Sequence, residues 1–140
     1  MDVKLICPEG QTIEYVRSLD GHVSDRAFTA ALSEGRCFAI TADGKNVGVL
    51  RYGLFWDTIP FLNLIYLEDG LRRGGIGFRA LALWESMMSQ QGHGMVMTST
   101  QSDEEAQHFY RAMGYKEAGC LLLDCPGYEQ PMEMFFTKAL

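Results

Sequence analysis

Residues 61–90 constrain the fold of this chain more than any other stretch. Residues 61–67 are almost continuously apolar and rich in β-favouring side chains, a pattern typical of a strand that is covered on both faces. Residues 76–90 repeat apolar side chains at helical spacing and predict a long amphipathic helix. A glycine-rich loop joins the two. The segment therefore predicts a buried strand, a tight loop and a helix that begins at the loop.

The loop has the composition of an anion-binding site. Gly74, Gly75 and Gly77 let the backbone adopt positive φ and approach a ligand closely. The helix that follows directs free N–H groups and the positive end of its dipole into the loop, where phosphate is stabilised. Arg72 and Arg73 add charge and forked donors. The loop is not a P-loop, because no Gly-Lys-Ser/Thr follows, and it lacks the third glycine of the dinucleotide fingerprint.

Hydrophobic periodicity and turn residues predict the elements on either side. Asp43-Gly44 is a hairpin signal, so the strands around it and the strand at 61–67 are expected to form an antiparallel meander. The strand after the long helix is expected to lie parallel to 61–67. Ser102 and Glu105 resemble a capping box for a late helix. The order is β-α-α-β-β-β-α-β-α-β-β in a single domain, 1–140, with elements at 2–7, 12–19, 24–32, 36–41, 46–56, 61–67, 76–90, 95–100, 106–113, 115–124 and 132–138.

Composition excludes several classes of partner. The formal charge is −6, and no basic stripe is visible apart from Arg72-Arg73, so nucleic acid is not expected as a partner. No apolar run reaches membrane-spanning length and the N-terminus lacks the form of a signal peptide, so we expect a cytoplasmic protein with no membrane partner. The four cysteines are scattered and lack zinc spacing, which predicts reduced thiols and no metal.

Two motifs resemble those of the GNAT N-acetyltransferase superfamily. Arg72-x-x-Gly75-x-Gly77 is similar to the family's Arg/Gln-x-x-Gly-x-Gly/Ala signature, which binds the pyrophosphate of acetyl-coenzyme A (acetyl-CoA). Residues 106–115, AQHFYRAMGY, resemble its late A-x-x-F-Y-x-x-x-G-F/Y helix and turn. The predicted order of elements is also the family's order. The resemblance implies an α/β (α+β) fold, the GNAT acyl-CoA N-acyltransferase fold, with a central mixed, mostly antiparallel sheet flanked by helices.

The resemblance also implies acetyl-CoA as co-substrate and a place for it. The loop holds the pyrophosphate, in part through backbone N–H groups. The pantetheine arm lies in a gap that a bulge opens beside strand 61–67. Counting back from Arg72 puts the bulge at Leu67, whose N–H is the candidate donor to the thioester carbonyl. The implied cofactor-binding residues are Tyr66, Leu67, Arg72, Arg73, Gly74, Gly75, Ile76, Gly77, Ala106, Phe109 and Tyr110.

The catalytic groups are only partly predicted. Tyr110 is the candidate general acid near the thioester sulfur, the alternative being a core residue of an amphipathic helix. Many relatives carry a glutamate in the strand, but 61–67 holds no carboxylate. Glu68 is either a base that acts through a water or a solvated residue of the turn. Asn63 either binds an amine or a water, or is a satisfied polar group of the sheet. A base elsewhere, a water chain and an acceptor amine of low pKa all remain open.

Phe55, Trp56 and Asp57 are candidates for the wall of the acceptor pocket, or form a hydrophobic loop that packs on the sheet or a partner subunit. The expected activity is acetyl transfer to an amine of a small molecule or peptide by direct attack. The alternatives are an acyl-CoA-binding sensor or accessory protein with little turnover, and a phosphate-ligand module outside the family. The last strands often pair across a homodimer in this fold, so a dimer is possible.

Overall fold

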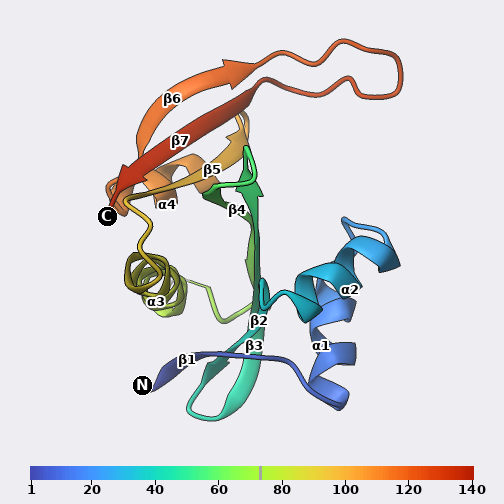
Figure 1. Cartoon of the computed structure of the whole chain (residues 1–140), viewed down its shortest axis with the longest axis vertical. Coiled ribbons are helices and arrows are strands. Elements are labelled where there is room, and N and C mark those ends of the chain that lie inside the picture. Colours follow the sequence, from blue (N-terminus) through green and yellow to red (C-terminus); the bar gives the residue numbers. More distant parts are fainter. Residues whose placement is uncertain (73) are drawn as a thin grey trace.

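The computed structural model describes residues 1–72 and 74–140. Within them, seven strands form one sheet with four helices around it (Figure 1). The order of elements is the predicted one, and the predicted fold is confirmed. The elements are β1 (Val3–Ile6), α1 (Gln11–Leu19), α2 (Asp25–Ser33), β2 (Cys37–Ala42), β3 (Lys45–Phe55), β4 (Ile59–Leu67), α3 (Ile76–Gln90), β5 (Met95–Gln101), α4 (Ala106–Ala112), β6 (Lys116–Leu121) and β7 (Glu133–Ala139).

The sheet order is β1-β2-β3-β4-β5-β7-β6. Strands β4 and β5 are parallel because α3 crosses between them, and the other neighbours are antiparallel, as the sequence predicts. The parallel pair is in register only at Phe61 with Met97 and at Leu62 with Thr98. Beyond Leu62 the two strands separate. We call the space between them the opening.

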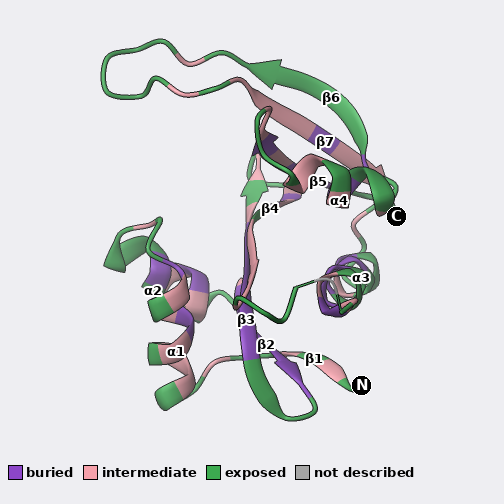
Figure 2. Ribbon diagram, turned by 180° about the vertical axis from the view of Figure 1, so that it is seen from behind, coloured by how far each residue is buried: buried purple, intermediate pink, exposed green. Residues whose placement is uncertain are grey.

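Helices cover the sheet on both faces, with α1 and α2 on one side and α3 and α4 on the other (Figures 1 and 2). On the α3/α4 face, the fully buried Trp84 and Met88 pack with Leu50 and Leu62. A second cluster on the α1/α2 face joins residues of both helices to β2 and β3, namely Val16, Phe28, Ala31, Cys37, Ala39 and Val49. The two faces therefore carry separate apolar layers.

Strand β4 contains one extra residue, Asn63. Arg51 of β3 lies opposite Leu64, while the next residue of β3 lies opposite Leu62. The bulge predicted at Leu67 is therefore wrong in position, because Leu67 lies in regular register with Gly48. The reason is the spacing of the apolar side chains. Leu62 and Leu67 both pack on the α3/α4 face, and an odd separation along a strand needs one inserted residue between them.

The capping box is also wrong. Helix α4 begins at Ala106, and Glu105 at its N-cap makes no side-chain cap hydrogen bond. Instead the Glu104 Oε1 accepts a hydrogen bond from the backbone N–H of Gln101 at 3.1 Å. The amide of Gln107 donates to the carbonyl of Ser102 at 2.9 Å. These two hydrogen bonds form the turn between β5 and α4, and they fix the side chain of Glu104 rather than that of Glu105.

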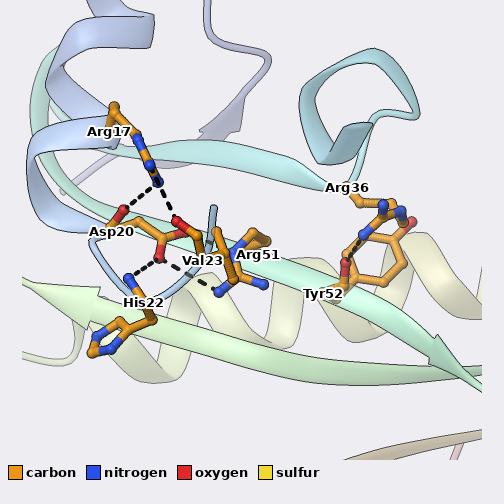
Figure 3. Close-up of polar contacts among 7 residues, drawn as sticks. All are labelled: Arg17, Asp20, His22, Val23, Arg36, Arg51 and Tyr52. Atoms are coloured by element: carbon orange, nitrogen blue, oxygen red, sulfur yellow. Dashed lines mark hydrogen bonds and ion pairs between the residues drawn. The ribbon is translucent and has the colours of Figure 1, made fainter. Parts of the chain in front are cut away.

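A buried ion pair ties α1 to the centre of the sheet (Figure 3). Asp20 follows α1 and is fully buried, and its Oδ2 lies 2.6 Å from the Nε of Arg51 on β3. The backbone N–H of His22 donates to the other carboxylate oxygen at 3.4 Å. Arg17 donates to the carbonyls of Asp20 and Val23 at 2.9 and 3.1 Å. These bonds fix the connection between α1 and α2 against β3.

Candidate active site

A cavity of about 860 Å³ lies where the opening meets α3 and α4. Its volume is within the range of small-molecule and cofactor sites. Eight predicted cofactor-binding residues line it: Tyr66, Leu67, Arg72, Gly75, Gly77, Ala106, Phe109 and Tyr110. The side chain of Ile76 instead lies in the core, Gly74 is exposed outside the cavity lining, and Arg73 lies outside the described residues. We call this the large cavity.

A second cavity of about 310 Å³ shares Ile65, Glu104, Ala106 and Tyr110 with the large cavity. Its other lining residues come from three strands: Phe61, Asn63, Leu64, Ser99, Thr100, Gln101 and Glu133. Most of these alternate along their strands with side chains that pack on the α3/α4 face, so they point to the α1/α2 face. The two cavities therefore meet at the opening and extend to opposite faces of the sheet. We call this the small cavity.

The first turn of α3 forms one end of the large cavity. Its N-cap residue, Gly75, has a left-handed conformation, with φ 82°, and the helix has no side-chain cap. A Cβ atom at Gly77 would lie 3.4 Å from the Phe109 ring, so glycine leaves the space beside the first turn open. The uncapped N–H groups and the helix dipole make this end of the cavity suited to a phosphate anion.

Arg72 stands at the same end, between the end of β4 and α3. Its Nε donates to the carbonyl of Leu67 at 3.2 Å, and its Nη2 lies 3.2 Å from a carboxylate oxygen of Asp69. The guanidinium carbon lies 5.0 Å from the centre of the Tyr66 ring. The Arg72–Asp69 pair is exposed and contributes little stability, so a phosphate can compete for the arginine.

The N–H of Leu67 points into the opening without any bulge at that residue. The next N–H, that of Glu68, donates to the carbonyl of Val47 on β3 at 3.0 Å. Successive N–H groups of a strand point to opposite sides, so the N–H of Leu67 points away from β3 and toward β5. At this level β4 and β5 are no longer in register. The backbone here offers a donor to a ligand in the opening.

Tyr110 lines both cavities and is 6% exposed. Burial raises the pKa of its phenol above the ordinary value of 10.0, and the charge of Glu104 acts in the same direction. A side-chain hydrogen bond with Thr98 acts in the opposite direction, with an effect on this pKa smaller than that of burial and larger than that of Glu104. Thr98 is itself held by β4, because its hydroxyl donates to the carbonyl of Leu62 at 3.0 Å. The phenol is therefore protonated at neutral pH and fixed beside the opening.

Glu104 is the first of two carboxylates that line the cavities and that the sequence did not predict. Its carboxylate lines both cavities, close enough to Tyr110 to influence the phenol. It lies in the turn between β5 and α4, held by the hydrogen bond from Gln101. Hydrophobic periodicity does not predict where a side chain points in an irregular turn. The apparent capping box at Ser102 and Glu105 predicted a role for Glu105 instead. Glu133, at the start of β7, is a second carboxylate of the small cavity that was not predicted.

Of the residues predicted as a base or as the acceptor wall, Asn63 lines a cavity, and Glu68 and the hairpin residues do not. Asn63, the bulge residue, lines the small cavity. Glu68 lines neither cavity, and its Oε2 accepts a hydrogen bond from the Tyr15 hydroxyl of α1 at 2.9 Å, which makes it a structural partner of α1. Phe55, Trp56 and Asp57 form the end of the β3–β4 hairpin and line neither cavity themselves.

The described part of the chain, 1–72 and 74–140, contains no group of three or more His, Cys, Asp or Glu side chains placed to hold a metal ion. None of its helices is long and apolar enough to cross a membrane.

The sequence profile of the Acetyltransferase (GNAT) family matches residues 8–115. No protein of curated function matches the chain. Similar solved structures include a GNAT acetyltransferase from Bacillus cereus, with 23% identity, TM-score 0.73 and coverage of 99% of this chain and 98% of that one. Arabidopsis thaliana Naa50, in complex with the bisubstrate analogue CoA-Ac-MVNAL, has 16% identity, TM-score 0.78 and full coverage of both chains, 100% each. The ribosomal-protein-S18-alanine N-acetyltransferase of Escherichia coli has 14% identity, TM-score 0.76 and coverage of 99% and 94%. At these identities the likeness shows the fold alone.

Proposed function

Since this chain belongs to the GNAT acetyltransferase family, we propose that it is an N-acetyltransferase that moves an acetyl group from acetyl-CoA to an amine of a small molecule or peptide by direct attack. One observation carries the proposal. The large and small cavities lie on opposite faces of the sheet and meet at the opening, where Tyr110 and Glu104 line both. An acetyl donor and an amine acceptor therefore approach the same groups from two sides.

The residues of the large cavity fit the donor. The uncapped first turn of α3 binds the pyrophosphate, with Arg72 beside it. The N–H of Leu67 binds the thioester oxygen, where negative charge develops during transfer. Acetyl-CoA supplies the activated acetyl group as a thioester. With the acetyl group in the opening, its carbonyl carbon is accessible from the small cavity.

The residues shared by the two cavities fit the transfer. Glu104 takes a proton from the acceptor ammonium, directly or through a water, so that the neutral amine attacks. A C–N bond forms, the C–S bond breaks with its electron pair on sulfur, and the proton left on the new amide nitrogen passes to water. Tyr110 donates a hydrogen bond to the departing sulfur. Its raised pKa makes complete proton transfer to a thiolate, with a reference pKa of about 8.5, unfavourable, so the thiolate takes its proton from water.

The acceptor class includes peptides. The peptide part of the analogue bound to Naa50, and the protein substrate named for the Escherichia coli enzyme, support an α-amine of a peptide or protein as one member of the class. An acyl-CoA-binding protein with little turnover is the second candidate. The sequence of β4, which carries no carboxylate, favours it. The two functions differ in whether free thiol is released when an amine is added.

Calorimetric titration with acetyl-CoA tests the donor site. We expect micromolar binding to the unaltered chain and a loss of at least about tenfold in Gly75→Trp, because the indole covers the first turn of α3 and the residue must adopt φ 82°. The matched control is Gly92→Trp, which imposes the same strain at the other end of α3, with φ 95° and open space around it. If both variants lost the same affinity for acetyl-CoA, backbone strain would explain the effect and the proposed donor site at the first turn of α3 would be contradicted.

Glu104→Gln tests the proton acceptor. We expect kcat/KM for the amine, followed by thiol release, to fall about tenfold. This is less than the 10²–10⁴ of enclosed acid–base groups, since Glu104 is exposed and water can replace it in part. The control is Glu105→Gln, the neighbouring carboxylate, whose side chain is 96% exposed and lines neither cavity. A rate equal to that of the unaltered chain would exclude Glu104.

A further inference from the structure

Three aromatic side chains form a row beside the small cavity, on the α1/α2 face. Phe55 of β3 stacks with Phe61 of β4 at a centroid distance of 6.1 Å and 23° between the planes. The ring of Phe61 meets the edge of Phe135 of β7 at 6.0 Å and 68°. All three are half-buried, and Phe61 also lines the cavity. We call these three residues the aromatic row.

The row lies outside the part of the sheet that α1 and α2 cover. Helix residues Val16 and Phe28 pack on Cys37 and Val49 of β2 and β3. Figure 1 shows both helices beside β2 and β3, away from β5 and β7. The burial pattern agrees, since β2 is buried throughout while most of β7 is only partly buried (Figure 2), and Phe135 is one of its partly buried residues.

The end of the β3–β4 hairpin extends the row into solvent. The ring of Trp56 lies 4.8 Å from that of Phe55, and Trp56 is 77% exposed. Its backbone adopts φ 56°, a left-handed conformation that a bulky side chain rarely adopts and that is strained. Folding stability alone would favour Gly or Asn at this position. An exposed tryptophan held at a conformational cost points to contact with a ligand.

The charge beside the row is negative. Within residues 1–72 and 74–140, the charged residues that line the small cavity are Glu104 and Glu133, and this lining includes no lysine or arginine. Glu133 accepts a hydrogen bond from the amide of Gln130 at 3.0 Å, and this partner carries no charge. Arg36 lies near Gly53 on the same face, and its Nη2 is 3.0 Å from the Oε1 of Glu34. An ammonium group is therefore attracted into the small cavity.

We propose that the aromatic row and the two carboxylates select the acceptor, which is a primary amine, protonated in solution, whose adjacent substituent is apolar or aromatic. The proposal rests on the proposed function. The ammonium enters between Glu104 and Glu133, and the substituent packs on Phe61 and its two aromatic neighbours. An acidic substituent is disfavoured, because it would meet the same two carboxylates.

Thiol release from acetyl-CoA with the amides of phenylalanine, leucine, alanine and glutamic acid tests the proposal. We expect kcat/KM for the phenylalanine and leucine amides to exceed that for the alanine amide by at least about tenfold, with the glutamic acid amide lowest. Phe61→Ala is expected to lower the phenylalanine-to-alanine ratio about tenfold. The ratio is the readout because lost stability changes both rates together. Phe55→Ala, which lies outside the cavity lining, is expected to lower the ratio less.

Equilibrium binding of the same amides, measured by calorimetry with coenzyme A present, separates this proposal from the proposed function. If phenylalanine amide binds more tightly than alanine amide but no thiol is released, the selection stands and acetyl transfer falls. Acetylation of all four amides at similar rates would overturn the selection and leave the transferase intact. An unchanged ratio in both Phe61→Ala and Phe55→Ala would overturn the role of the row. Tyr128→Ala, an exposed aromatic in the β6–β7 loop, is the control expected to change no ratio.

Discussion

Tyr110→Phe is expected to lower kcat for acetyl transfer about 10²-fold, with little change in the affinity for acetyl-CoA. In the proposed function the substitution removes a donor to the atom on which negative charge develops, and such donors contribute about 10²–10³ in kcat. The ring itself, packed 5.6 Å from Tyr115 and 6.2 Å from Phe136, is retained. Steady-state thiol release at saturating acceptor gives kcat, and calorimetry gives the affinity.

Tyr115→Phe is the matched control. Tyr115 belongs to the same aromatic cluster, but its hydroxyl donates to Glu85 at 2.8 Å and lines neither cavity. We expect this variant to lose stability and keep kcat. If Tyr110→Phe retained kcat within about twofold, Tyr110 would be a core residue of α4. The pH profile adds a second readout. Because the pKa of Tyr110 is raised above 10.0, the phenol keeps its proton as pH rises from 7 to 10, and kcat should show no fall from this group there.

Asp20→Ala is expected to lower the free energy of unfolding by about 3–5 kcal/mol. The carboxylate of Asp20 is fully buried, and its removal leaves the guanidinium of Arg51, itself only 8% exposed, without its buried partner. Burial of an uncompensated charge is among the most destabilising changes that one substitution makes. Urea denaturation followed by circular dichroism measures the change.

Asp25→Ala is the comparison for Asp20→Ala. Asp25 also pairs with an arginine, Arg17 at 2.7 Å, but its side chain is 97% exposed, so the expected loss is about 0–1 kcal/mol. The pair Asp20→Leu with Arg51→Met should recover much of the stability that Asp20→Ala loses, since no buried charge remains. Equal losses at Asp20 and Asp25 would mean that water reaches the Asp20–Arg51 pair.

The fold was predictable because its signals are local. The buried strand, the glycine loop and the helix at residues 61–90 lie next to each other in sequence, and each has its own period or turn chemistry. The order of all eleven elements followed from the same signals. The position of the bulge was not predictable in this way, because a strand that is apolar on both faces gives no signal of which residues share a face; only the packing shows that Leu62 and Leu67 do.

The residues of the candidate site were less predictable than the fold because they come from irregular or distant segments. Tyr110 was found through its motif, whereas Glu104 owes its direction to the turn before α4. Glu133 reaches the small cavity because β7 inserts between β5 and β6, a topology that no local pattern encodes. Phe55 and Trp56 were singled out because the family resemblance places this hairpin beside the acceptor pocket, but their relation to the cavity depends on the ring of Phe61, which lies between them and the site.

The short parallel register between β4 and β5 makes the sheet two half-sheets joined by a narrow seam. Strands β1–β4 and strands β5–β7 each pair over their length, whereas the seam is in register at only two positions, Phe61 with Met97 and Leu62 with Thr98. A molecule bound in the opening contacts both halves and takes the place of the missing strand contacts. A ligand in the opening is therefore expected to raise the free energy of unfolding, in addition to the core cluster around α3 that already joins the two halves.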